Sequence, residues 1–182
     1  MFALRVDQDI ELRLLEERHA DGLFALVDAN REHLRPWLPW VDGTRSAADT
    51  RAFVKTALEQ LVAGREYVCG IWHRGELAGT IGLDVDTQSR HGEIGYWVAG
   101  PLQGHGIITR SVQALTSAGF ADLGLNRIAI LCATGNTRSC AVAERLDYRL
   151  EGTLREAERV GDRYHDLRVY AMLARDWDPG PG

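Results

Sequence analysis

The stretch Gln103-Gly104-His105-Gly106-Ile107-Ile108-Thr109 stands directly before a run of residues with helical periodicity. A glycine-rich loop that opens a helix binds anions, because the first N–H groups of the helix have no partner and the positive end of the helix dipole faces the ligand. Gly104 and Gly106 would let the backbone approach that ligand without an intervening Cβ. The stretch therefore predicts a phosphate-binding loop.

Two common phosphate-binding motifs do not match this loop. A dinucleotide fingerprint reads G-x-G-x-x-G and is followed about 20 residues later by an acid. Here the third glycine position is Thr109, and the stretch from Ala129 to Ala133 contains no acid. A nucleoside-triphosphate loop ends in G-K-[ST], whereas Lys55 is the only lysine of the chain. The loop therefore serves a different phosphate compound.

A second segment lies 27 residues after Gly106, from Ala133 to Tyr148. Together the two segments resemble the GNAT superfamily of acyl-CoA-dependent N-acyltransferases. Gln103 and Gly106 match its Q-x-x-G-x-[GA] loop. Asn136, Ser139 and Val142 match its N-x-x-S-x-x-[AV] segment.

The resemblance extends to the RimJ/RimL-type branch of N-terminal acetyltransferases and covers residues 8 to 177. It is carried by Leu34–Leu38, Glu93–Val98, Asn126-Arg127, Leu150–Gly152 with Leu154-Arg155, Tyr164–Asp166 and Tyr170–Leu173. Two positions depart from the superfamily pattern. Ile108 replaces a small residue, and we expect its side chain to point away from the loop. Asp147 replaces a glycine, so the turn after the second segment is expected to differ.

Periodicity predicts strands at residues 10–15, 67–73, 77–85, 93–99, 127–132, 149–156 and 163–173, and helices at 20–30, 46–64, 106–121 and 137–146. This order predicts an α/β sandwich. The resemblance implies the GNAT fold, a mixed, mostly antiparallel sheet of about seven strands with splayed central strands, flanking helices, and a thioester between the fourth and fifth strands. We expect one domain over residues 1–177 and a disordered tail at 178–182.

Composition excludes several other classes. The 182 residues carry a net charge of −5, which gives no electrostatic footprint for nucleic acid. No apolar run approaches the roughly 18 residues of a membrane span, and the N-terminus does not read as a signal peptide. Cys69, Cys132 and Cys140 have no metal-ligand spacing and are odd in number, so we expect reduced thiols in a cytoplasmic protein.

An acyl-CoA and an amine can react directly, without a covalent intermediate. The reaction needs a group that removes a proton from the ammonium, a donor for the oxyanion, and a proton for the departing thiolate. The resemblance implies that a backbone N–H at Val98 or Ala99 serves the oxyanion, and that Asn136 holds the pantetheine arm. The diphosphate would be held at the loop, by Gln103, Gly104, His105, Gly106, Ile107, Ile108 and Thr109. Ser139 could protonate the sulfur, and Tyr148 is the alternative acid.

Glu93 is the candidate base, because a lone carboxylate in an otherwise apolar strand is unusual. Deprotonation of a peptide N-terminus needs little assistance from a base. At pH 7.5 an α-amine with a pKa near 7.8 is about one-third neutral, whereas a lysine near 10.4 is about 0.1% neutral. The difference, about 3.5 kcal/mol, favours the α-amine as acceptor when the base is modest.

The acceptor site is expected where aromatic residues stand beside prolines in the segment from His33 to Trp40, together with the closing hairpin. The candidate acceptor-binding residues are His33, Trp37, Trp40, Tyr164 and His165. The histidines show no metal-binding pair, so no metal is expected.

The sequence thus predicts an acetyl-CoA-dependent N-acetyltransferase for a protein N-terminal α-amine, of ribosomal-protein type by family analogy. The alternatives are a small-molecule or peptide-like amine such as an antibiotic or metabolite, another donor such as succinyl-CoA, and a non-catalytic CoA-binding module. A homo-oligomer is expected from the resemblance alone.

Overall fold

The computed structural model describes residues 3–178, so the predicted tail lies outside the described residues apart from Asp178. The strands are β1 (Ala3–Arg5), β2 (Ile10–Leu14), β3 (Glu66–His73), β4 (Glu76–Asp86), β5 (His91–Val98), β6 (Arg127–Ala133), β7 (Arg149–Val160) and β8 (Arg163–Leu173). The helices are α1 (Ala20–Ala29), α2 (Arg31–Leu34), α3 (Ala47–Val62), α4 (Ile107–Ala121) and α5 (Thr137–Arg145), with 3-10 turns at Glu17–His19, Gly100–Leu102 and Ala174–Asp176.

The strands form one sheet in the order β1-β2-β3-β4-β5-β6-β8-β7. Eight strands replace the predicted seven. The additional strand, β1, is three residues long and pairs antiparallel with β2, for example Leu4 with Leu12. A segment this short does not alternate for long enough to be recognised from the sequence.

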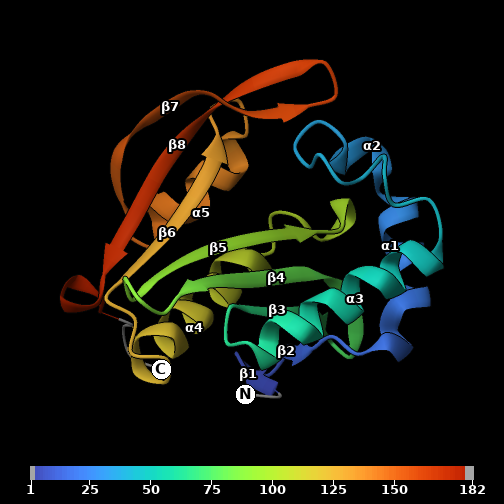
Figure 1. The fold of residues 1–182 in the computed structure, drawn as a ribbon, viewed down its shortest axis with the longest axis horizontal. Coiled ribbons are helices and arrows are strands. Elements are labelled where there is room, and N and C mark those ends of the chain that lie inside the picture. The colour runs from blue at the N-terminus through green and yellow to red at the C-terminus, as the bar shows by residue number, and fades with distance from the viewer. Residues whose placement is uncertain (1–2, 179–182) are drawn as a thin grey trace.

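The sheet splits between β5 and β6, the only parallel neighbours of the described sheet. They pair at three positions, the last being Glu93 with Ala129. Beyond Glu93, β5 stays paired with β4 as far as Val98, and β6 stays paired with β8 as far as Ala133. The two strands therefore diverge, and β6, β8 and β7 turn away from the rest of the sheet (Figure 1). This confirms the splayed GNAT fold that the resemblance implied.

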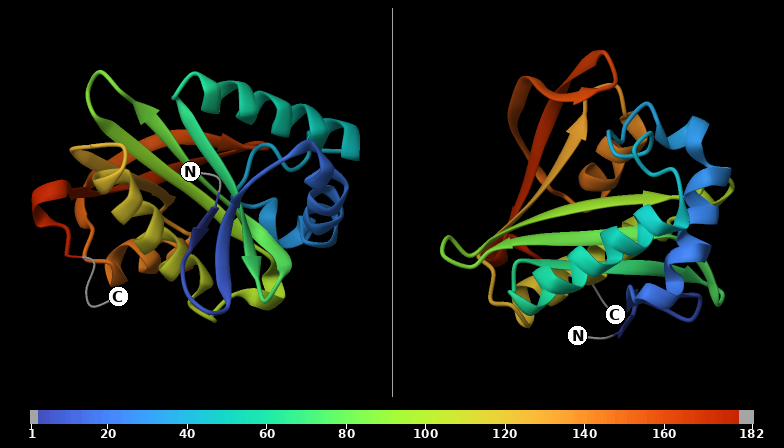
Figure 2. Two further views of the ribbon diagram at one scale, coloured as in Figure 1. Left: turned by 90° about the horizontal axis from the view of Figure 1, so that it is seen from below. Right: turned by 45° about the vertical axis from the view of Figure 1, so that its right-hand side comes forward.

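Helices cover both faces of the sheet (Figure 2). On one face, α1 and α3 bury an apolar cluster that includes Val27, Val54 and Trp97. On the other, α4 and α5 pack over a larger cluster that includes Val112 and Ile130. Both faces of the central strands are therefore buried, and the sheet forms a rigid support from which the loops at the ends of β5 and β6 project.

The two ends of α5 have well-defined caps. At its start, Asn136 Oδ1 accepts the backbone N–H of Ser139 at 3.2 Å. At its end, the N–H groups of Asp147 and Tyr148 donate to the carbonyls of Glu144 and Ala143, and Asp147 has a φ of 56°. This is a Schellman motif, in which glycine usually holds the left-handed position. Asp147 thus adopts the conformation of the glycine it replaces, and the expectation of a different turn was wrong.

Candidate active site

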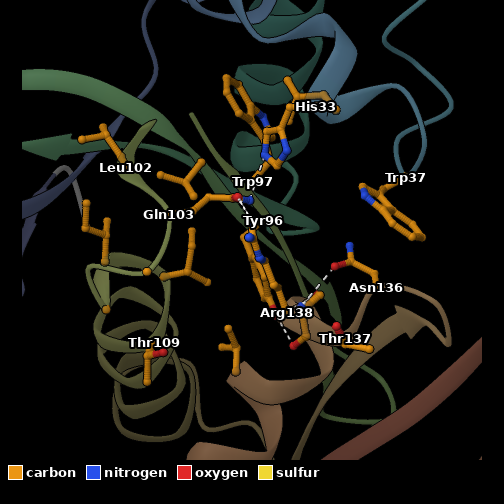
Figure 3. A pocket seen from close by; sticks show the side chains of 18 of the residues that line it. His33, Trp37, Tyr96, Trp97, Leu102, Gln103, Thr109, Asn136, Thr137 and Arg138 are labelled. Carbon is orange, nitrogen blue, oxygen red and sulfur yellow. Dashed lines mark hydrogen bonds between the residues drawn. The ribbon is translucent and has the colours of Figure 1, made fainter. Parts of the chain in front are cut away.

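A cleft of about 860 Å³ opens where β5 and β6 separate. We call it the main cleft. It is bounded by the segment of His33 and Trp37, by β5 from Tyr96 to Val98, by the loop and first turn of α4, and by the start of α5. Figure 3 shows Tyr96 and Gln103 near its centre, between Thr109 and Asn136.

The loop before α4 presents a row of backbone donors to this cleft. Gly104 and Gly106 have φ values of 78° and 71°, a region that L side chains rarely adopt. Across residues 3–178 no backbone or side-chain acceptor is found for the six N–H groups from Gly104 to Thr109. These groups also lie at the positive end of the α4 dipole. The loop therefore offers an anion site made of main-chain donors.

The side chains of the loop play different parts. Ile107 and Ile108 pack in the core and bring only their backbone to the loop. His105 is exposed and does not line the cleft, which leaves only its N–H as a candidate contact. Gln103 Oε1 accepts a hydrogen bond from Arg138, and Gln103 Nε2 lies 2.9 Å from His33 Nε2. The amide of Gln103 thus joins the loop to α5 and to α2.

Two backbone groups at the end of β5 were predicted as oxyanion donors, and the structure separates them. The N–H of Ala99 donates to the carbonyl of Ala78 at 2.8 Å and is therefore not free. Successive N–H groups of a strand point to opposite edges, so the N–H of Val98 points away from β4, toward the side on which β6 has diverged. Val98 remains the candidate donor, and the prediction for Ala99 was wrong.

The hydroxyl of Ser139 lies between two polar groups. Its Oγ is 3.1 Å from the hydroxyl of Tyr96 and 3.3 Å from Cys132 Sγ. The Tyr96 hydroxyl also donates to the backbone carbonyl of Ser139 at 3.2 Å. Burial raises the pKa of the Tyr96 phenol and raises that of the Cys132 thiol to about 12. Burial therefore favours the protonated form of both groups at neutral pH.

A side pocket of about 230 Å³ adjoins the main cleft. The two cavities share five lining residues, which are Trp37, Leu38, Tyr96, Asn136 and Ser139. The side pocket is otherwise formed by β5, β6 and the β7–β8 hairpin. A ligand in the main cleft and a second ligand in the side pocket would therefore meet beside Ser139.

Two carboxylates line the side pocket, Glu93 on β5 and Glu158 on β7. Loss of solvation, followed by the negative charges of Asp84 and Glu158, raises the pKa of Glu93. Loss of solvation also raises the pKa of Glu158, against the opposing effect of His165. Carboxylates with raised pKa values in a pocket are suited to receive a proton from an ammonium group.

The candidate acceptor-binding residues fall into two groups. His33 and Trp37 line the main cleft, and Trp37 also lines the side pocket. His33 lies on the short helix α2 rather than in a loop. The other three, Trp40, Tyr164 and His165, line neither cavity. His165 instead packs beside Trp37, with ring centroids 5.9 Å apart. This contact joins the β7–β8 hairpin to the segment from His33 to Trp40.

Tyr148 lies in the core and not in either cavity. Its ring is 4% exposed, and its hydroxyl is 2.7 Å from that of Thr116 on α4. The structure therefore gives no support to Tyr148 as the acid, and this alternative was wrong. Asn136 was predicted to hold the pantetheine arm through its side-chain amide. The oxygen of that amide already accepts a hydrogen bond that caps α5.

The sequence did not single out Tyr96 or Glu158 as functional. By sequence, Tyr96 is an ordinary strand aromatic, and Glu158 is one of several charged residues just beyond the predicted strand at 149–156. The alternation of side chains along β5 puts Tyr96 on the face opposite to that of Glu93. Only the structure, in which β5 and β6 diverge, shows that the Tyr96 hydroxyl reaches Ser139. Within residues 3–178, no group of three or more His, Cys, Asp or Glu side chains is placed to hold a metal.

The splayed sheet, the main-chain anion loop and the shared wall of two cavities are the features of an acyltransferase that brings two substrates together. The family model described as Acetyltransferase (GNAT) domain matches residues 9–149. The chain belongs to the GNAT family and is an N-acetyltransferase.

The relatives include enzymes that modify ribosomal proteins. The ribosomal-protein-serine acetyltransferase of Escherichia coli (strain K12) is 33% identical over 93% of this chain and 96% of its own length. YdaF of Bacillus subtilis (strain 168), whose name carries the provisional description ribosomal N-acetyltransferase, is 36% identical over 98% of both chains. A structure of RimL, a ribosomal L7/L12 alpha-N-protein acetyltransferase in complex with coenzyme A, has a TM-score of 0.91 and 31% identity over 94% of this chain and 97% of that chain.

Proposed function

We propose that this chain transfers the acetyl group of acetyl-CoA to the α-amine of a protein N-terminus, with a ribosomal protein as the first candidate. The observation that carries this proposal is the meeting of the two cavities at Tyr96, Asn136 and Ser139. The main cleft suits the donor, because it combines a main-chain anion loop with a gap between strands. The side pocket, with its two carboxylates, suits the acceptor amine.

The donor is oriented by groups at both ends of the gap. The N–H groups from Gly104 to Thr109 hold the diphosphate, and the pantetheine arm passes between β5 and β6. The thioester carbonyl then accepts a hydrogen bond from the N–H of Val98, which stabilises the oxyanion as it forms. The RimL structure in complex with coenzyme A supports this placement, because its chain superposes on this one over most of its length.

Proton transfer completes the reaction. Glu93, directly or through a water, takes a proton from the ammonium, and the neutral amine attacks the carbonyl carbon. The nitrogen of the tetrahedral intermediate then gives its second proton to solvent, and the intermediate collapses as the carbon–sulfur bond breaks. Ser139 gives its proton to the thiolate and regains one from solvent, directly or by relay through the Tyr96 hydroxyl. The products are the acetylated amine and coenzyme A, with the net released proton on Glu93.

The α-amine is the better acceptor for this site. A lysine must be deprotonated against about 3.5 kcal/mol more than an α-amine at neutral pH. The side pocket supplies only carboxylates to do so, and the negative charges of Glu93 and Glu158 stabilise an ammonium rather than the free amine. These residues therefore bind a cationic terminus well and deprotonate a lysine poorly.

Mass spectrometry with synthetic peptides tests the function. Peptides that copy ribosomal-protein N-termini are incubated with the enzyme and acetyl-CoA, each in a form with a free α-amine and in a form with a blocked α-amine and one lysine. Acetylation of the free terminus alone is expected. Transfer to small amines but to no peptide would instead support an antibiotic- or metabolite-modifying enzyme, and binding of CoA without transfer would support a non-catalytic module.

Two further properties belong to the same proposal. Modification of ribosomal proteins would place the chain in the cytoplasm. Within residues 3–178, no helix is long and apolar enough to cross a membrane. A homo-oligomer is also proposed, because the edge strand β7 exposes Leu150 and Leu154, which a second copy could cover.

A further inference from the structure

The main cleft continues beyond the phosphate loop, along one face of α5. Its lining includes Arg138, Val142 and Arg145, which are spaced four and three residues apart and therefore share a face of the helix over two turns. From α4, by contrast, only the first turn, up to Arg110, lines the cleft. The cleft thus has an outer part, formed by the second half of α5, that the diphosphate alone does not fill.

Three arginines line the main cleft in a chain whose net charge is −5. The charge of Arg110 is balanced, because its Nε lies 2.9 Å from Asp7 Oδ2. Arg138 donates to the neutral amide of Gln103. Among residues 3–178, no hydrogen-bond or ion-pair partner is found for the guanidinium of Arg145. The outer part of the cleft therefore carries an uncompensated positive charge.

A CoA donor has two separate anionic groups, the diphosphate and the 3′-phosphate on the adenosine ribose. The loop, with Arg138 beside it, faces the first. Arg145 lies seven residues beyond Arg138, about 10 Å further along the helix axis. One ribose separates the two anionic groups of CoA, which places the second group toward the outer part of the cleft. A guanidinium forms paired, charge-assisted hydrogen bonds with a phosphate.

We infer that Arg145 binds the 3′-phosphate of the CoA donor and makes the enzyme distinguish acetyl-CoA from acetyl-dephospho-CoA. This inference rests on the proposed function, in which a CoA thioester occupies the main cleft. Arg145 acts on donor affinity alone, because it lies at the end of α5 opposite to Ser139.

Steady-state kinetics with the two donors tests the inference. For the unmodified enzyme, we expect KM for acetyl-dephospho-CoA to exceed that for acetyl-CoA by about fivefold to tenfold. Arg145→Gln should raise KM for acetyl-CoA to the level of the dephospho donor, leave KM for the dephospho donor unchanged, and leave kcat unchanged with both. Salt should reduce the preference of the unmodified enzyme, because the pair is exposed to solvent.

Arg65→Gln is the matched control. It also removes one exposed arginine charge, but Arg65 precedes β3 and lines neither cavity. This variant should keep the preference for acetyl-CoA. If Arg145→Gln were too unstable to assay, Arg145→Lys would decide the question, because it keeps the charge without the planar fork and must lose part of the preference.

Two results would overturn the inference. One is equal use of the two donors by the unmodified enzyme, and the other is an equal loss of both donors in Arg145→Gln. A protein that neither binds nor uses either donor would instead contradict the proposed function.

Discussion

At the scale of single residues, the chemistry centres on the hydroxyl of Ser139. Ser139→Ala should lower kcat about a hundredfold, the usual contribution of one acid–base group, while the dissociation constant of CoA stays within about twofold. The Tyr96 hydroxyl keeps its bond to the backbone carbonyl at position 139, so the local structure should survive. Rapid-quench or coupled assays of thiol release, with calorimetry for CoA binding, provide the measurement.

Two further variants serve as the control and as the test of the alternative acid. Tyr148→Phe removes a phenol that lies in the core and should leave kcat unchanged, with some loss of stability from the broken bond to Thr116. If Ser139→Ala retains full turnover while Tyr96→Phe loses it, the acid is Tyr96 and the role given to Ser139 is wrong.

Glu93 should affect activity and stability in opposite directions. Its pKa is raised above the ordinary value of 4.5, so the folded state holds the proton more tightly than the unfolded state, and ionisation of Glu93 costs stability. That cost is absent below pH 4.5 and grows as the pH rises through the raised pKa. Glu93→Gln should therefore raise Tm at pH 7, with the difference vanishing in acid, and should lower kcat/KM by about tenfold to a hundredfold.

The shape of the pH–rate profile separates a base from a binding group. For the unmodified enzyme, kcat/KM should fall in acid as Glu93 takes up its proton. Glu158→Gln removes a neighbouring negative charge, so it should lower the pKa of Glu93. The acidic limb of the profile, where kcat/KM falls, should then move to lower pH. A limb that stays in place in both Glu variants would show that neither carboxylate accepts the proton.

At the scale of elements, the turn from Gln103 into α4 determines donor binding. Gly106→Ala adds a Cβ where φ is 71°, which costs about 1–2 kcal/mol or forces the loop to change shape. Because the donors are main-chain N–H groups, a changed loop should raise KM for acetyl-CoA about tenfold or more, with a smaller effect on the acceptor KM.

Gly64→Ala is the control for this prediction. Gly64 follows α3, has a φ of 68°, and has open space around its Cα, so it imposes similar strain far from the cleft. It should lower Tm without changing either KM. Equal donor affinity in Gly106→Ala and in the unmodified enzyme would argue against a main-chain diphosphate site.

At the scale of the whole molecule, the outermost strand β7 is the expected contact between copies. It is twelve residues long, has one strand neighbour, and exposes Leu150 and Leu154 by 49% and 48%. A long edge strand with exposed apolar side chains favours association. Light scattering after gel filtration should show an oligomer, and the double variant Leu150→Asp/Leu154→Asp should give monomers. A monomeric unmodified protein would contradict this prediction.

The sequence predicted features formed by neighbouring residues, whereas contacts between residues far apart in the chain became known only from the structure. The loop at Gly104 and Gly106 and the helix after it are local features, set by backbone conformation and neighbouring hydrogen bonds, so a motif was enough to place them. The prediction for Ala99 failed because a free N–H depends on the partner strand, and that for Tyr148 failed because the direction of a side chain depends on packing.

By itself, the sequence indicated the family and the position of the anion loop through short motifs, and hydrophobic periodicity indicated the order of strands and helices. The splay of the sheet was predicted only through the resemblance that those motifs carry. Only the tertiary structure decided which groups surround the reacting atoms. The contact between Tyr96 and Ser139 joins residues 43 positions apart, and the pocket that holds Glu93 with Glu158 exists only because β6 carries the hairpin away from β5. Such contacts depend on the divergence of two strands, and no local pattern encodes their separation.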